Sequence, residues 1–254
     1  MITDLTGKAT DARSGQAASI LMEIHPGTEI RLDSGGRMVA LYLSSGVEYR
    51  FRGPSHMEFL PTRPRVHSGP EPERRSSPFV GHAALKSGGL TQAAFVMRGS
   101  RTVGSVKLLT LANTTTLDNR PEFRWVPVDG ASTYRIEVTD GAGRALLEER
   151  TDAPAYRPPE AMRLQNGMTY TWQVSTRTAD GRRYIGAADF TVADSALRQQ
   201  VDALRPPADA SISARVAFAV WLHGARLKDE ARRYWERIAV ERPSDPKLRE
   251  MANR

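Results

Sequence analysis

Apolar and polar residues alternate through residues 28–60, and three turn clusters divide the alternation into four short runs. Apolar side chains at every second position are typical of strands with one buried face, and glycine, serine and proline between the runs favour turns. The alternating positions are Ile30 and Leu32, then Val39, Leu41 and Leu43, then Val47, Tyr49 and Phe51, then Met57 and Phe59. The pattern predicts an antiparallel β-meander over residues 1–60.

Residues 61–87 lose this alternation and are rich in proline and arginine. Proline removes a backbone donor and fixes φ, so we expect an exposed loop or linker in this segment. Within residues 88–112, the stretches 91–97 and 102–111 have the composition of two further strands. We expect these strands to complete or join the N-terminal domain.

Alternation returns between residues 113 and 193, where Asp-Gly and Asn-Gly dipeptides separate the runs. Such dipeptides favour tight turns between neighbouring strands. They begin at Asp129, Asp140, Asn166 and Asp180. Strands separated in this way over a stretch of roughly 80 residues predict one immunoglobulin-like β-sandwich.

The apolar period changes from two to about 3.6 after Asp194, which is typical of helices. A first helix follows Asp194 and ends at Pro206-Pro207, a second runs from near Ser211 to about Gly224, and a third begins at Asp229 and stops before Pro243. Residues 194–254 are therefore predicted to form a three-helix tail. The predicted fold class is mainly β, with two β-domains and this C-terminal helical hairpin or tail.

Composition and charge narrow the classes of function. The 254 residues include no cysteine, which excludes disulfides, thiolate metal sites and cysteine nucleophiles. No apolar run reaches the roughly 18 residues of a membrane helix, so we expect no integral membrane span. Residues 61–100 and 196–254 each carry a net charge of +4, which together with near-neutral β-regions gives +7 overall. The near-neutral β-regions do not offer a basic sheet with aromatic residues on which bases could stack, so we expect no nucleic-acid partner.

Residues 1–60 resemble a FecR-type periplasmic domain. The resemblance is carried by residues 25–30 (His-Pro-Gly-Thr-Glu-Ile), by Ser34-Gly35-Gly36-Arg37 and by the run from Val47 to Phe59. It covers about a quarter of the chain. It implies a periplasmic, cell-envelope location and a recognition role without catalysis. Well-known family members also carry an anti-sigma segment and a membrane helix, which this sequence does not contain, so their sigma-regulating activity is not carried over.

Two further resemblances lie downstream. Residues 120–192 are similar to a fibronectin type III or related immunoglobulin-like module, through residues 121–138 and through Leu164 placed six before Tyr170. In that fold the tyrosine is structural, because its hydroxyl hydrogen-bonds to upstream backbone. The segment after Gly224 resembles the second half of a tetratricopeptide repeat, through Ala231, Trp235 and Pro243. One such repeat cannot bury its own faces, so it must pack on another part of the chain or on a second protein.

The sequence predicts no catalytic, cofactor-binding or metal-binding residues. No Gly-x-Ser-x-Gly motif is present, and no two histidines have ligand spacing on one element. His56 and His67 are expected in or beside turns, and the acidic pair Glu148-Glu149 on opposite faces of an edge strand. These features favour a protein that is not an enzyme.

Six arginines are the candidate partner-binding residues. They lie in the two basic segments at Arg63, Arg65, Arg74, Arg75, Arg226 and Arg237. Ordinary linker composition and helix-surface ion pairs, such as Asp229 with Arg233 and Arg232 with Glu236, are the competing interpretation of these segments. The main hypothesis is a non-enzymatic periplasmic protein that binds another protein or peptidoglycan. The alternative is a FecR-type signalling or sensor component that acts with a separate membrane or sigma-factor partner. The oligomeric state is left open.

Overall fold

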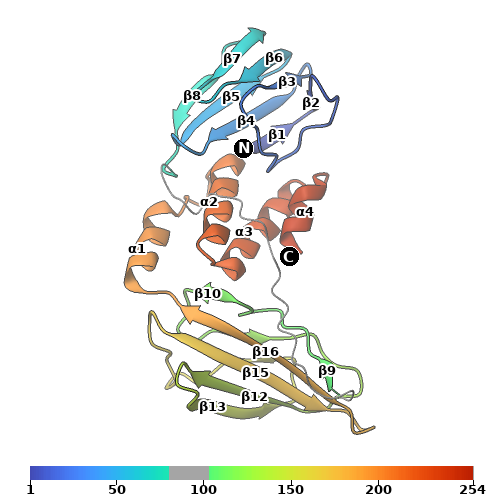
Figure 1. Cartoon of the computed structure of the whole chain (residues 1–254), viewed down its shortest axis with the longest axis vertical. Helices are drawn as coiled ribbons and strands as arrows, with labels where there is room; N and C mark the ends of the chain where they lie inside the picture. Colours follow the sequence, from blue (N-terminus) through green and yellow to red (C-terminus); the bar gives the residue numbers. More distant parts are fainter. Residues whose placement is uncertain (80–102, 254) are drawn as a thin grey trace. The chain divides into compact units, whose positions relative to one another are not determined.

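The computed structural model describes residues 1–79 and 103–253, and this part of the chain is mainly β with four helices (Figure 1). It divides into two compact units. Among the described residues, the first unit combines residues 1–79 with 204–225 and 230–253, and the second combines residues 103–203 with 226–229. The division differs from the expected order of domains, because most of the expected helical tail belongs to the same unit as the N-terminal strands.

Two four-stranded antiparallel sheets form the β-part of the first unit. Their orders are β1-β4-β5-β8 and β2-β3-β6-β7. The strands are β1 (Ile2–Thr6), β2 (Ala9–Asp11), β3 (Thr28–Leu32), β4 (Arg37–Tyr42), β5 (Val47–Arg52), β6 (Ser55–Phe59), β7 (Pro64–Ser68) and β8 (Glu73–Ser76). The inward side chains of both sheets share one core, which includes Ile2, Ile30, Met38, Phe51, Met57 and Phe59.

The four predicted runs are all strands, but their pairing corrects the expected meander. Among these four strands, only β4 and β5 pair as neighbours in sequence, whereas β3 pairs with β6. The chain changes sheet at the turn before β4 and again at Gly53, and these two turns contact each other. The Gly53 amide donates to the Gly36 carbonyl at 2.8 Å, and a Cβ on Gly53 would lie 1.9 Å from the Asp33 carbonyl oxygen. Glycine therefore permits the close approach that a simple meander does not need.

The expected linker also contains structure. β7 and β8 lie within residues 61–87, where they extend the two sheets by pairing with β6 and β5. Proline at the first residue of β7 and the mostly exposed side chains of both strands fit edge positions, where ladder bonds are needed on one side only. The low hydrophobicity of β7 and β8 is therefore that of edge strands. The prediction of a loop or linker was wrong for these residues.

Three helices complete the first unit: α2 (Ile212–Gly224), α3 (Lys228–Glu241) and α4 (Pro246–Ala252). The Ser211 side chain caps α2 by accepting from the Ala214 amide, and α2 is buried on most of its surface. α3 buries Ala231, Trp235 and Ile238, as its spacing predicted. The fourth helix of the chain was not expected, although Asp245 as its N-cap and Pro246 in its first turn are a recognisable start signal.

A buried chain of polar groups joins α2 to the first sheet. The Ser213 hydroxyl on α2 donates to the Glu48 carboxylate on β5 at 2.9 Å, and it lies 2.7 Å from the Thr3 hydroxyl on β1. A hydroxyl has one proton, so Thr3 donates to Ser213 when Ser213 donates to Glu48. Phe218 on α2 also contacts Phe79, with ring centroids 6.3 Å apart. The helices after residue 204 are thus an integral part of the first unit.

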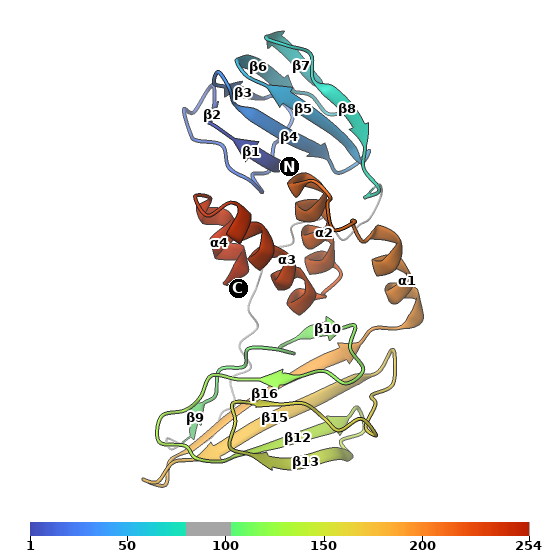
Figure 2. The same ribbon diagram turned by 180° about the vertical axis from the view of Figure 1, so that it is seen from behind.

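The second unit has one large sheet and one small sheet. The large sheet has the order β10-β16-β15-β12-β13, with β9 also paired to β16, and the small sheet pairs β11 with β14. The strands are β9 (Val103–Ser105), β10 (Thr114–Thr116), β11 (Phe123–Arg124), β12 (Tyr134–Asp140), β13 (Ala145–Thr151), β14 (Ala155–Tyr156), β15 (Thr169–Arg177) and β16 (Arg183–Val192). Figures 1 and 2 show β12, β13 and β15 side by side.

The core of the second unit is aromatic. The buried Trp172 ring lies 5.0 Å from Phe123 and 6.4 Å from Trp125, centroid to centroid. The Tyr170 hydroxyl accepts a hydrogen bond from the Gln165 amide at 2.8 Å, so the expected structural role of this tyrosine is confirmed. Glu148 and Glu149 lie on the edge strand β13, as expected, and both are exposed.

The segment 88–112 differs from its expected role. Residues 91–97 lie outside the described residues, whereas β9 pairs in parallel with β16 of the second unit. The described strand therefore does not complete the N-terminal sheets. The first predicted helix, α1 (Ser195–Leu204), is present and follows β16 directly. The Arg198 guanidinium holds it by donating to the carbonyls of Ala193 and Leu117.

Candidate ligand-binding groove

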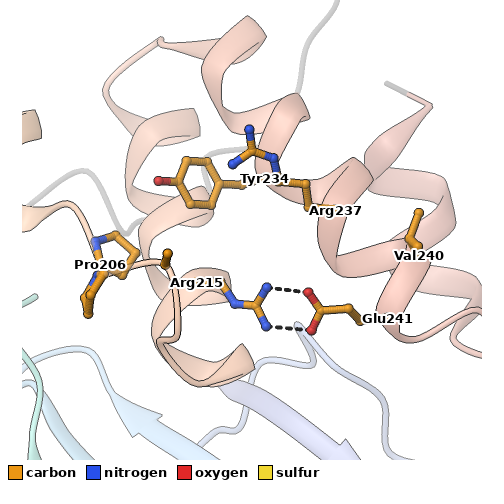
Figure 3. A pocket seen from close by; sticks show the side chains of 8 residues that line it. Pro206, Arg215, Tyr234, Arg237, Val240 and Glu241 are labelled. Carbon is orange, nitrogen blue, oxygen red and sulfur yellow. Dashed lines mark hydrogen bonds and ion pairs between the residues drawn. The ribbon is translucent and has the colours of Figure 1, made fainter.

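A hollow of about 460 Å³ lies in the helical part of the first unit (Figure 3). The loop before α2, the helix α2 and the outer side of α3 form its walls. The lining residues are Pro206, Pro207, Ala208, Arg215, Tyr234, Arg237, Val240 and Glu241. Its volume falls in the range of about 300–1,000 Å³ that is usual for small-ligand or peptide side-chain pockets. We refer to this hollow as the groove.

Local sequence explains how the groove is built. Pro206 and Pro207 end α1 and force a non-helical loop before α2 begins. On α3, Tyr234, Arg237 and Glu241 are three and four residues apart, so they lie on one side of the helix. The Tyr234 ring packs edge-to-face on buried Phe218 with centroids 5.0 Å apart, which fixes this wall.

An ion pair crosses the groove. Arg215 on α2 donates to both carboxylate oxygens of Glu241 on α3, at 2.5 and 2.7 Å (Figure 3). These hydrogen bonds hold the pKa of the Glu241 carboxyl below its usual range, against a smaller opposing effect of burial. The same contact raises the pKa of Arg215. Because Glu241 is committed to Arg215, it is a positioning group for the two helices and a poor candidate for a catalytic base.

The Glu241 carboxyl is expected to titrate below an ordinary glutamate. A carboxyl that is more acidic in the folded state stabilises the fold above the unfolded-state pKa, and this stabilisation is lost as pH falls through the lowered pKa. An NMR pH titration of the Glu241 side-chain carboxyl measures the midpoint directly. Arg215→Gln should raise that midpoint, and Arg249→Gln, an exposed change on α4, should leave it in place. An unchanged midpoint in Arg215→Gln contradicts the pairing.

Two exposed side chains give the groove its binding character. Arg237 is exposed and has no ion pair or hydrogen bond with any residue that the structure describes. Val240 is 79% exposed, which is the largest exposure of the big apolar side chains in the described part of the chain. Figure 3 shows Arg237 beside Tyr234 on the same wall. A free cation next to exposed apolar surface is suited to binding an anionic group that carries an apolar neighbour.

The six predicted partner-binding arginines do not form one site. Arg63 precedes β7 and Arg65 lies on it, where Arg65 pairs with Glu58 at 3.4 Å. Arg74 and Arg75 lie on β8, where Arg75 is 3.8 Å from Glu73. Only Arg237 lines the groove.

Arg226 belongs to the second unit and has a structural role in its backbone. It adopts a φ of 65°, and its carbonyl oxygen accepts from the Thr114 hydroxyl at 2.7 Å and from the Thr115 amide at 2.8 Å. Sequence reasoning missed the other groove residues, among them Tyr234 and Val240. The available signal was their spacing around Arg237 on α3.

A second polar cluster lies on the outer face of the sheet β2-β3-β6-β7. His56 and His67 lie within strands β6 and β7, which corrects their expected placement in turns, and their ring centroids are 5.0 Å apart. His56 Nε2 is 3.1 Å from Glu29, and His67 Nε2 is 3.6 Å from Glu58. Hydrogen bonding from Arg13, and secondarily from His56, lowers the pKa of Glu29. Within the described ranges, no group of three or more such side chains has the geometry of a metal site.

No protein-family model and no curated protein matches the chain. Similar solved structures include CopC from Methylosinus trichosporium OB3b, at 20% identity over 35% of this chain and 95% of that chain, with a TM-score of 0.27. They also include the sixth fibronectin type III domain of human fibronectin type III domain containing protein 3, at 16% identity over 39% and 92% of the two chains, with a TM-score of 0.27. A third is the FN5 domain of Drosophila Lar, at 18% identity over 36% and 98%, with a TM-score of 0.26. At these identities and scores, the neighbours say nothing about the function of this chain.

No helix within residues 1–79 or 103–253 is both long enough and apolar enough to cross a bilayer.

Proposed function

We propose that the chain is a non-enzymatic, periplasmic component of the bacterial cell envelope that binds another protein through the groove. The single observation that carries the proposal is a hollow of the first unit that is lined both by Arg237, which has no ion pair among the described residues, and by the exposed Val240 side chain. Concave surfaces that combine apolar side chains with a few charged groups are typical of binding sites.

Support for a binding role also comes from the groove's chemistry. Its titratable residues are two arginines, a tyrosine and a glutamate, and the glutamate is already paired with Arg215. A general base must be free to exchange a proton, and the one carboxylate of this lining is held by Arg215. The groove can instead orient a partner by charge and by apolar contact.

The envelope location rests on the resemblance of residues 25–59 to a FecR-type periplasmic domain. The fibronectin type III or immunoglobulin-like character of the second unit and the tetratricopeptide-like character of α2 and α3 are parts of the same proposal. Both kinds of module commonly present surfaces to partners without catalysis. The helical groove of the first unit holds the contact in this proposal.

A pull-down from an envelope extract under mild crosslinking tests the proposal. The bait is the full chain in three forms: unchanged, Arg237→Gln, and the matched control Arg249→Gln on α4, where Arg249 is also exposed. We expect the unchanged chain and the control to retain the same protein, and Arg237→Gln to retain several-fold less. Co-sedimentation with purified peptidoglycan is measured in parallel. The proposal fails if no protein is captured across salt conditions, or if Arg237→Gln captures as much as the unchanged chain.

A further inference from the structure

The charge pattern along α3 leaves two cations unmatched. Arg233 and Arg237 are four residues apart and both are exposed, and neither has an ion pair with any residue in the described part of the chain. The expected partner of Arg233 is occupied elsewhere, because the Asp229 carboxylate accepts a hydrogen bond from the Leu111 amide at 2.9 Å. The sequence-based pairing of Asp229 with Arg233 was therefore wrong.

Three further acids lie on the helix, Glu230, Glu236 and Glu241, and none of them is without a partner. Glu236 lies 3.9 Å from Arg232, and Glu241 is held by both nitrogens of Arg215. Like charges four residues apart on a helix repel each other by a few tenths of a kcal/mol, and an anion placed between them removes this repulsion. Arg233 and Arg237 thus form a cationic edge of α3 that has no ion-pair partner among the described residues, and Arg237 of this edge lines the groove.

Apolar surface completes the site. Pro206 and Pro207 form one wall, and the exposed Val240 side chain lies on the opposite element, α3. A free inorganic anion or a sugar acid would leave this apolar surface in water. A peptide side chain would cover it and gain the free energy of burying apolar area.

We propose that the groove binds an extended protein segment in which an aspartate or glutamate stands next to an apolar residue. The carboxylate lies on Arg237, with Arg233 reinforcing the charge, and the apolar side chain lies against Val240, Tyr234 and the two prolines. This inference rests on the proposed protein-binding function and names the chemistry of the partner. Arginine suits the role because its planar guanidinium makes two parallel hydrogen bonds to one carboxylate.

The test uses a random twelve-residue peptide library displayed on phage and selected on the immobilised full chain. We expect the selected peptides to share an acidic residue next to an apolar one. The strongest peptide is then synthesised with its acid intact and with that acid replaced by the corresponding amide, and each form is titrated calorimetrically. Loss of one charge-assisted hydrogen bond should raise the dissociation constant of the peptide by about tenfold or more. The acidic form should also bind more weakly as salt rises.

Substitutions in the groove test whether the selected peptides bind there. Arg237→Gln and Val240→Ser should each weaken the acidic peptide, whereas Arg249→Gln should not, and circular dichroism checks that all three remain folded. Selected peptides without acids, or peptides that bind Arg237→Gln unchanged, overturn the acidic-segment proposal while leaving a protein-binding function in place. Arg237-dependent binding of soluble peptidoglycan fragments without peptide binding overturns it as well. Failure of both the peptide selection and the envelope pull-down overturns the proposed function itself.

Discussion

Trp172→Ala is expected to destabilise the second unit by about 3–5 kcal/mol, the usual cost of truncating a fully buried tryptophan. Trp172 is 0% exposed, and its ring packs against Phe123 and Trp125. The indole Nε1 also donates to the Leu111 carbonyl at 2.9 Å, so truncation leaves a cavity and an orphaned buried acceptor. Trp172→Phe keeps part of the packing and should cost less.

Hydrogen exchange read peptide by peptide measures this effect within the intact chain. Trp172→Ala should reduce protection in residues 134–140 and 169–192, which form the large sheet. Protection in residues 28–59, which belong to the first unit, should change little. An equal loss in both regions contradicts the division into two units.

Ser213→Ala is expected to destabilise the first unit by about 2–3 kcal/mol. The substitution removes the donor to the Glu48 carboxylate, which is only 6% exposed. The remaining cation near Glu48 is Arg50, at 3.6 Å and partly in solvent, so the buried charge loses most of its compensation. A buried carboxylate left without a hydrogen bond is the main source of the cost.

A double-mutant cycle isolates this contact. The Glu48→Ala variant has no buried carboxylate that could lose its hydrogen bond. Adding Ser213→Ala to this variant should therefore lower the free energy of unfolding much less than Ser213→Ala does alone. Urea unfolding of the four proteins, monitored by tryptophan fluorescence, gives the free energies, because α2 and α3 carry Trp221 and Trp235. Strictly additive costs contradict the Ser213–Glu48 hydrogen bond and with it the docking of α2 on the first sheet.

Local pattern predicted the elements well where one face of an element is buried. The strands over residues 28–59 and three of the four helices after residue 194 follow directly from periods of two and 3.6. Pairing between strands could not be predicted in the same way, because alternation fixes which side chains point inward and says nothing about which sheet a strand joins. The contact between Gly53 and the turn at Gly36 decides that question and is a long-range feature.

Edge strands, and a unit that is built from segments far apart in the sequence, could not be predicted from the sequence. β7 and β8 bury little, so their composition is that of a loop, and only their pairing with β6 and β5 makes them strands. The docking of α2 depends on Thr3 and Glu48, which are more than 160 residues away from Ser213. Neither residue stands out in the sequence, because a buried polar contact has no local signature.

The candidate site was predictable only in part. Arg237 was selected from the sequence as a candidate partner-binding residue, but its neighbour Arg233 was assigned a partner, Asp229, that hydrogen-bonds elsewhere. The groove itself needs the loop at Pro206-Pro207 to face α3, which is a tertiary relation. The cluster of His56, His67, Glu29 and Glu58 likewise arises from neighbouring strands and has no linear motif.

Site-specific photo-crosslinking tests the binding role of the groove most directly. A photoreactive residue is placed at Val240 in the groove and, in a second protein, at Leu146, which is 43% exposed on the edge strand β13 of the second unit. After irradiation in an envelope extract, the Val240 protein should crosslink to one protein partner, and Arg237→Gln in the same chain should abolish the product. Crosslinking to that partner from Leu146 alone, or from Val240 regardless of Arg237, would contradict binding at the groove.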